Sequence, residues 1–404
     1  MAAPRHAGGG CNTGVGGGGV GHDDDRLSAL PDDLLHAIMS RVKALQVAQT
    51  CVLSTRWRHL WCAVSCLDVD EQEFGTHNNF EDFTTSLLGS HDIAFLDAFR
   101  LHATNLGSYQ RRHLTHRWVR RAMGLDDTRP CRLRRLHLSG LNLNMEDIAS
   151  HVSSRCPALE DLELENCNYY ITCNINIASS SLKKLVVDSV SFGHDDNTFA
   201  LVIDTPALVS LCLDGEFEHI VDYREPHSMP SLVDASIHLP VIEDMKPWYH
   251  YAEFLTPTML ELNIIGALSN VTSLQLSQFV VMLRLYPDCE DLPVYNFKNL
   301  RTLFLDECHI SDDFLGLQQY LRNSHNLQKL TFCCCKVSNF GPREELIQRR
   351  HSYFEDLADF KCENLRLSEI IYQDGEDDVH LLVKFLEGMR KNLSNNKIEL
   401  TKVD

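Results

Sequence analysis

Residues 153–167 read SSRCPALEDLELENC, and the hexapeptide LEDLEL within them decides the fold because its pattern recurs along most of the chain. Polar residues typical of a helix end come first, Cys156-Pro157 interrupts the helix, and a short strand and a turn follow. Alternate leucines of the strand enter a core, and the residues between them face solvent. Nine fragments of the form L-x-x-L-x-L, with close substitutes, start at Leu133, Leu159, Leu182, Leu208, Leu232, Val271, Leu300, Leu327 and Cys362.

The starts of these fragments lie 23 to 39 residues apart, within or near the range of leucine-rich repeats. Stacked units of this kind form a curved solenoid with a parallel sheet on the concave side, and helical or extended segments return over the convex side. We therefore expect an α/β fold in which a leucine-rich-repeat solenoid occupies residues 131–358.

Residues 25–70, DRLSALPDDLLHAIMSRVKALQVAQTCVLSTRWRHLWCAVSCLDVD, predict a small all-α three-helix module ahead of the solenoid. Pro31 suits the start of a helix, and acidic residues follow in its first turn. A second helix is expected over residues 45–51. Ser54 is a candidate cap for a third helix, on which Trp57 and Trp61 lie four residues apart. So small a module cannot bury all of its apolar surface, which indicates a docking surface.

The segments LPDDLL, TCVLSTRWRHLW and LDVD within this module resemble the plant F-box motif. The resemblance implies docking onto a Skp-family adaptor, which connects through a cullin to a RING subunit of an SCF-type ubiquitin ligase. Lys43 departs from the motif, because many F-boxes have a second proline there. The adaptor contacts that the resemblance implies are Leu30, Pro31, Leu34, Ile38, Val52, Leu53, Trp57 and Trp61. The competing interpretation is that these residues form only an internal core.

The remaining segments complete the expected domain organisation. Residues 1–24 are glycine-rich and predict a disordered tail, and residues 71–130 predict a connecting helical unit. The irregular repeats resemble the plant leucine-rich-repeat region that follows an F-box. Residues 359–404 resemble the FBD-type C-terminal unit of those proteins, whose strand, helix and final strand would cap the solenoid.

Composition and motifs exclude several classes of function. The formal charge of −19, from 56 acidic and 37 basic side chains, argues against a general binder of nucleic acid or of anionic membranes. The 15 cysteines, without a secretory segment or an apolar span, predict reduced thiols in the cytoplasm or the nucleus. No C-x-x-C, H-E-x-x-H, G-x-S-x-G or Walker loop is present, so we expect no metal site, no cofactor and no catalytic residue.

The function expected from these features is substrate recognition for an SCF-type ligase, with an unknown protein target bound by the solvent-facing side chains of the sheet. The alternative is a non-catalytic leucine-rich-repeat scaffold without coupling to ubiquitin. The basic side chains of the sheet lie on distant repeats, so no phosphate cofactor is expected. The predicted substrate-face residues are Arg135, His137, Asp161, Glu163, Lys184, Phe304, Lys329 and Arg366.

Overall fold

The computed structural model of the chain describes residues 30–104, 112–124, 131–170, 175–192, 201–215, 229–238, 268–281, 296–312, 314–338, 363–373, 378–390 and 396–403. The predicted tail at residues 1–24 lies outside these ranges, as does Cys362, where the last predicted fragment starts. None of the helices in the described ranges has the length and apolarity needed to cross a membrane.

Short helices form the N-terminal part, here called the helical end (residues 30–64). They are α1 (Asp32–Met39), α2 (Ala44–Gln49) and α3 (Trp57–Leu60), with 3₁₀ turns at Thr50–Val52 and Trp61–Ala63. Pro31 occupies the N-cap position of α1, and the acidic residues predicted in its first turn are there. Ser54 does not cap α3: the N-cap residue is Arg56, and the Ser54 hydroxyl is buried with no hydrogen-bond partner among the described residues.

The helical end has a small core of its own. Leu35 and Met39 face inward from α1 and pack with Trp57 of α3. Their apolar neighbours on α1, Leu34 and Ile38, remain exposed. The apolar stripe of α1 is therefore divided into an inner face that holds the helices together and an outer face that is exposed among the described residues.

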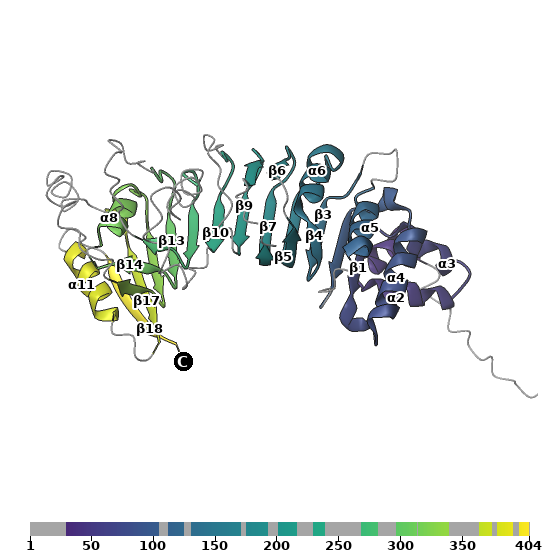
Figure 1. Cartoon of the computed structure of the whole chain (residues 1–404), viewed down its shortest axis with the longest axis horizontal. Coiled ribbons are helices and arrows are strands. Elements are labelled where there is room, and N and C mark those ends of the chain that lie inside the picture. Colours follow the sequence, from purple (N-terminus) through teal and green to yellow (C-terminus); the bar gives the residue numbers. More distant parts are fainter. Residues whose placement is uncertain are drawn as a thin grey trace, which may run out of the picture.

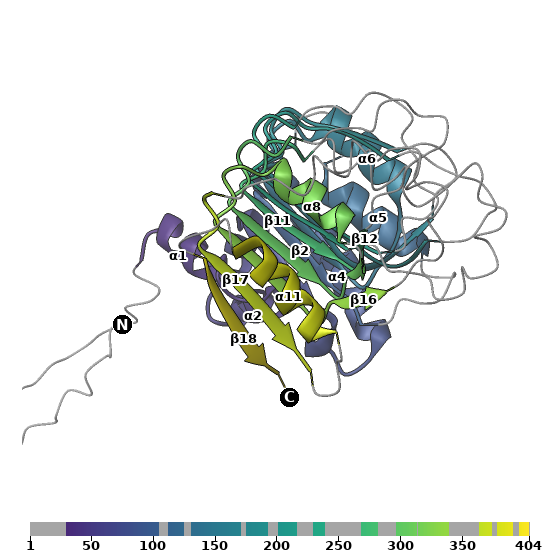
Figure 2. The same ribbon diagram turned by 90° about the vertical axis from the view of Figure 1, so that its left-hand side faces the viewer.

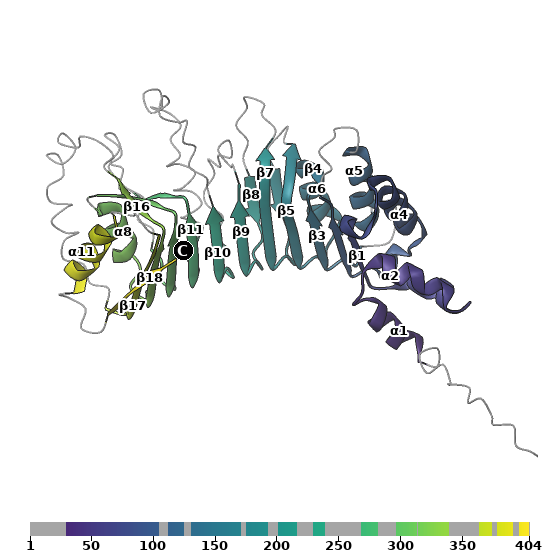
Figure 3. The same cartoon turned by 90° about the horizontal axis from the view of Figure 1, so that it is seen from below.

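The largest element is a parallel sheet in which each main strand pairs with the next one along the chain (Figures 1 and 3). Parallel pairing in chain order follows from the repeats, because each returns to the same edge before the next strand begins. The main strands are β1 (Cys66–Asp70), β2 (Ala98–His102), β3 (Arg135–Ser139), β5 (Asp161–Tyr170), β7 (Lys184–Phe192), β9 (Ser210–Asp214), β10 (Asp234–His238), β11 (Ser273–Ser277), β13 (Thr302–Asp306), β15 (Lys329–Cys333), β17 (Leu367–Tyr372) and β18 (Lys397–Lys402).

The sheet begins earlier than the sequence predicted. β1 and β2 precede Leu133, and Phe99 of β2 aligns with Leu67 on one side and Leu136 on the other. The prediction that residues 71–130 are only a helical connection is therefore corrected: the segment holds β2 as well as α4 (His77–Ser90) and α5 (Arg112–Ala122). The repeat pattern was obscured because Phe99 and valines stand at leucine positions.

Helices and short strands lie along one side of the sheet. Seen end-on, α6 (Met145–Arg155), α8 (Leu315–Arg322) and α11 (Val379–Arg390) occupy the same side (Figure 2). Two further 3₁₀ turns, at Glu71–Glu73 and Ile93–Phe95, lie between β1 and β2. The remaining strands are β4 (Asn142–Asn144), which pairs with β5, then β6 (Ile175–Ala178) with β8 (Leu201–Asp204), and β12 (Val280–Val281), β14 (His309–Ser311) and β16 (Lys336–Ser338) together.

Five of the described repeats turn at or near the end of the core strand through one residue with a positive φ. The next residue is buried, and its thiol is the donor in three repeats: Cys167 to the Leu138 carbonyl (3.6 Å), Cys308 to that of Leu276 (3.2 Å) and Cys335 to that of Leu305 (3.3 Å). The cysteines thus satisfy backbone carbonyls where the chain leaves the sheet. The turn residues are Gly140, Asn166, Gln278, Glu307 and Cys334.

The C-terminal unit contains the three predicted elements: β17, α11 and β18. Leu382 and Leu386 of α11 are fully buried in the main core, and the aromatic ring of Phe385 stacks on Phe314 with centroids 4.6 Å apart. β18 pairs with β17 in parallel and is the last strand of the sheet. The unit thus continues the sheet and covers its final repeat.

Candidate functional site

The helical end exposes a set of large apolar side chains, here called the apolar end surface: Leu34, Ile38, Val42, Val52 and Leu53. These five make up half of the ten large exposed apolar side chains in the described part of the chain. Val52 is 87% exposed, Leu53 57%, Leu34 52% and Ile38 44%. Such a concentration in one short segment is unusual for a surface that faces only water.

Four of the predicted adaptor residues lie on the apolar end surface: Leu34, Ile38, Val52 and Leu53. Pro31, which precedes α1, is also exposed. Leu30 and Trp61 are half-buried and pack against the small core. Trp57 is only 2% exposed, so the prediction that it contacts a partner directly is wrong. The helical spacing of the two tryptophans could not show which of them turns inward.

Polar contacts hold the helices beneath the apolar end surface. Arg56 pairs with Asp32 and donates to the Leu30 carbonyl at 2.7 Å, which joins the start of α1 to the start of α3. The His36 Nε2 atom lies 3.0 Å from the Leu60 carbonyl oxygen. These contacts join α1 and α3 at both of their ends, so the exposed side chains of α1 are held in a defined orientation.

Lys43 joins the helical end to the sheet. It precedes α2 in an extended conformation, and its ammonium lies 2.9 Å from an Asp68 oxygen and 3.2 Å from an Asp70 oxygen of β1. Burial alone would lower the pKa of Lys43, but the hydrogen bonds and charges of the two aspartates outweigh it and raise that pKa. Because α1 ends at Met39, lysine in place of proline does not lengthen that helix.

The second candidate surface is the open sheet face, formed by the side chains of β3–β17 that point away from α6, α8 and α11. Strand register places the predicted residues in two rows. Arg135, Asp161, Lys184 and Lys329 occupy one row. His137, Glu163 and Phe304 occupy the other.

Arg366 is the exception among the predicted substrate-face residues. The register pairs Leu330 with Ser368 and Phe332 with Ile370, so the last repeat starts at Leu365 and not at Cys362. Arg366 therefore precedes β17, where its backbone N–H donates to the Gln328 carbonyl at 2.9 Å. Glu369 takes the open position instead and pairs with Lys329 at 3.1 Å.

A third row of the open sheet face was missed from the sequence. It includes Glu165, Asp188, Asp214 and His238, near the ends of β5, β7, β9 and β10. Burial raises the pKa of Asp188, and the nearby Asp214 and Glu165 charges add to that rise. Each of these residues directly follows the last apolar position of its L-x-x-L-x-L fragment, so aligning the repeats would have found the row.

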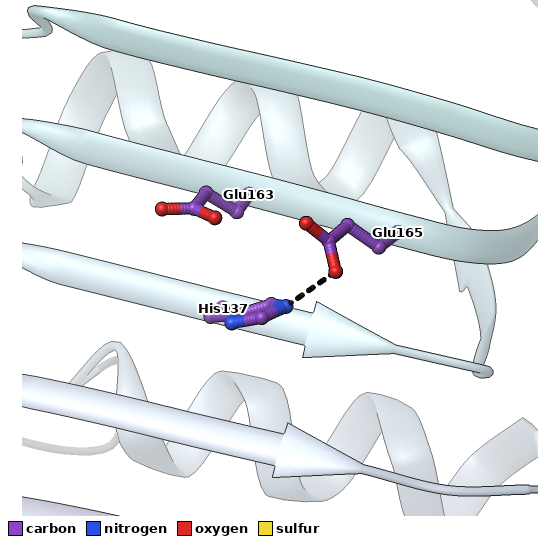
Figure 4. A group of neighbouring side chains, drawn as sticks. All are labelled: His137, Glu163 and Glu165. Carbon is purple, nitrogen blue, oxygen red and sulfur yellow. Dashed lines mark hydrogen bonds and ion pairs between the residues drawn. The ribbon is translucent and has the colours of Figure 1, made fainter. Parts of the chain in front are cut away.

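Ion pairs across neighbouring strands organise this face. The Lys184 ammonium lies 3.0 Å from a Glu163 oxygen, and the His238 Nδ1 atom lies 3.3 Å from an Asp214 oxygen. His137 and Glu165 are joined at 3.0 Å, with Glu163 beside them (Figure 4). Among the described residues, these three side chains are the one group whose nitrogen and oxygen atoms lie close enough together to hold a metal ion.

Comparison with known proteins matches both parts of the chain. Residues 27–68 match the F-box domain. A meiotic F-box protein of Oryza sativa subsp. japonica is 29% identical over 91% of this chain and 84% of its own length. An F-box/FBD/LRR-repeat protein of Arabidopsis thaliana is 31% identical over 47% of this chain and 52% of its own length. An F-box/LRR-repeat protein of the same plant is 25% identical over 80% of this chain and 98% of its own length. The chain therefore carries an F-box domain, and plant F-box/FBD/LRR-repeat and F-box/LRR-repeat proteins are among its relatives.

Proposed function

We propose that this chain is the substrate-recognition subunit of an SCF-type ubiquitin ligase. The helical end would dock a Skp-family adaptor, and through it a cullin and a RING subunit. The observation that carries the proposal is the apolar end surface: large aliphatic side chains of a matched F-box are exposed while their inward neighbours form a complete core. An apolar surface held in a defined orientation suits a permanent partner.

The sheet and its returning segments act in this proposal as a leucine-rich-repeat solenoid that presents a protein target. Parallel strands in chain order, with a buried cysteine after the strand in three repeats, support that assignment. The chain catalyses nothing itself and acts by raising the local concentration of the target near the ligase. We place this function in the cytoplasm or the nucleus.

The first test is binding of a purified Skp-family adaptor to the full chain. Introducing aspartate at Val52 and Leu53 places two charges on the apolar end surface, which is expected to weaken binding at least about 30-fold. The matched control is Val209→Asp, because Val209 is an exposed valine beside the sheet, away from the helical end. Equal binding by the wild-type chain and the double variant would contradict the proposed docking surface.

The alternative is a scaffold that binds through the solenoid without coupling to ubiquitin. A folded wild-type chain that binds no Skp-family adaptor would favour this alternative. The Val52 and Leu53 variants are better suited to the test than a Trp57 variant, because Trp57 lies in the small core and its loss disturbs folding together with any docking.

A further inference from the structure

We infer that His137, Glu163 and Glu165 on the open sheet face form a binding site for one divalent transition-metal cation of the zinc class. The site is separate from the proposed adaptor-docking surface and does not depend on the proposed function. One atom from each side chain takes part, and these three atoms lie within 4.8 Å of one another. They comprise one imidazole nitrogen and two carboxylate oxygens, a donor set that zinc and its neighbours accept in proteins.

Adjacent strands of the sheet position the three donors. His137 of β3 lies directly opposite Glu163 of β5, and Glu165 follows on the same face of β5 (Figure 4). Both strands are interior to the parallel sheet, and their backbones are fixed by pairing on each side. A site carried by two paired strands needs only side-chain rotation to bind.

The distances fit a metal after a small adjustment. Zinc ligands lie about 2.0–2.2 Å from the ion, so neighbouring ligand atoms are about 3.0–3.5 Å apart. The His137 Nε2 and Glu165 Oε2 atoms are already 3.0 Å apart. The widest separation in the group, up to 4.8 Å, requires a rotation of the flexible glutamate side chains.

Lys184 provides an internal competitor for the cation. Its ammonium lies 3.0 Å from a Glu163 oxygen and neutralises part of the negative charge that would attract a metal. All three donor side chains are partly exposed, with 24–37% of their area accessible, so water can complete the coordination. The result is a three-ligand site with open positions toward solvent, like zinc sites that keep a place for water or for a fourth group.

A sequence search could not find this site, because His137 and Glu165 are 28 residues apart and match no compact motif. Only the register of β3 against β5 brings them together.

The test is titration of Zn²⁺ alone into the chelator-treated full chain, followed by calorimetry. The variants His137→Ala and Glu165→Gln are each expected to lose one bound zinc equivalent or to bind it at least about tenfold more weakly. Loss of a group that only supports a metal ligand already lowers metal affinity by about 10–100-fold. Lys184→Gln is expected to bind that equivalent more tightly, because it frees Glu163. Substituting Co²⁺ gives a visible spectrum that the His137 variant should change.

His238→Ala is the matched control, because His238 also pairs with an acidic residue on the open sheet face but belongs to no three-donor group among the described residues. It should bind as the wild-type chain does. If His137→Ala and Glu165→Gln keep the number and affinity of the bound zinc ions, the site is overturned. His137→Gln and far-UV circular dichroism separate loss of a ligand from loss of folding, and adaptor binding should be the same in all of these variants.

Discussion

At the scale of single residues, Gly140 shows how tightly the repeats stack. It turns the chain after β3 with a φ of +71°, and its N–H donates to the Glu165 carbonyl of the next repeat at 3.0 Å. A Cβ atom there would lie 1.7 Å from the Ala103 carbonyl oxygen of the preceding repeat. Neither the backbone angle nor the space allows a side chain.

Gly140→Ala is therefore expected to destabilise the chain by about 2–5 kcal/mol, the combined cost of a left-handed residue and of overpacking. Urea denaturation measures the change. Gly75→Ala is the control, because a Cβ at Gly75 meets nothing within 4 Å. A difference of under about 1 kcal/mol between the two variants would show that the repeats can separate to admit the methyl group.

His91 predicts an acid-sensitive contribution to stability. Its Nε2 atom lies 2.9 Å from the Val64 carbonyl, while the buried Nδ1 atom has no hydrogen-bond partner among the described residues. Burial lowers the pKa of His91 in the folded chain, so the unfolded chain binds more protons as the pH falls through the ordinary value of about 6.5. The contribution of neutral, buried His91 to the free energy of unfolding is therefore fully present above that pH and is lost progressively below it.

Between pH 7.5 and pH 5.5, we expect the melting temperature of the His91→Gln variant to fall less than that of the wild-type chain. The glutamine amide keeps a donor for the Val64 carbonyl but cannot take up a proton. Thermal melts at the two pH values make the comparison. An equal loss in both proteins would mean that other groups account for the acid sensitivity.

At the scale of elements, α11 is held to the last repeats by its buried leucines. Leu386 is fully buried against the last repeats, and Lys384 on the same helix is exposed. Leu386→Ala is expected to cost about 2–5 kcal/mol, the range for truncating a buried leucine. Lys384→Ala should change stability by about 0.5 kcal/mol or less. Chemical denaturation of both variants tests whether α11 is an integral cap: similar stabilities would mean that the sheet is stable without it.

At the scale of the whole molecule, two cores coexist. One runs under the sheet from Ala44 to Leu386, and the other comprises the six buried residues of the helical end. Ala44 of α2 belongs to the main core, Trp61 packs against both cores, and Lys43 pairs with Asp68 and Asp70 of β1, but the core within the outer helices is much the smaller of the two. The helical end therefore has the smaller reserve of stability.

Trp57→Ala removes the largest side chain of the small core, at a cost of about 3–5 kcal/mol. We expect the helical end to open while the sheet stays folded. Hydrogen exchange followed by mass spectrometry should show lost protection over residues 30–64 and retained protection over residues 135–170. Uniform loss along the chain would indicate instead that the molecule unfolds as one unit.

The sequence by itself determined the repeating strand, the apolar core positions and the start of α1, because these depend on local periodicity and on the chemistry of proline and acidic residues. It also identified most of the exposed apolar residues of the helical end. Tertiary structure alone decided which tryptophan is buried, where the sheet begins, and that the last repeat starts at Leu365. It also brought His137 to Glu165, since a contact across paired strands depends on register, and register is set by the whole stack of repeats.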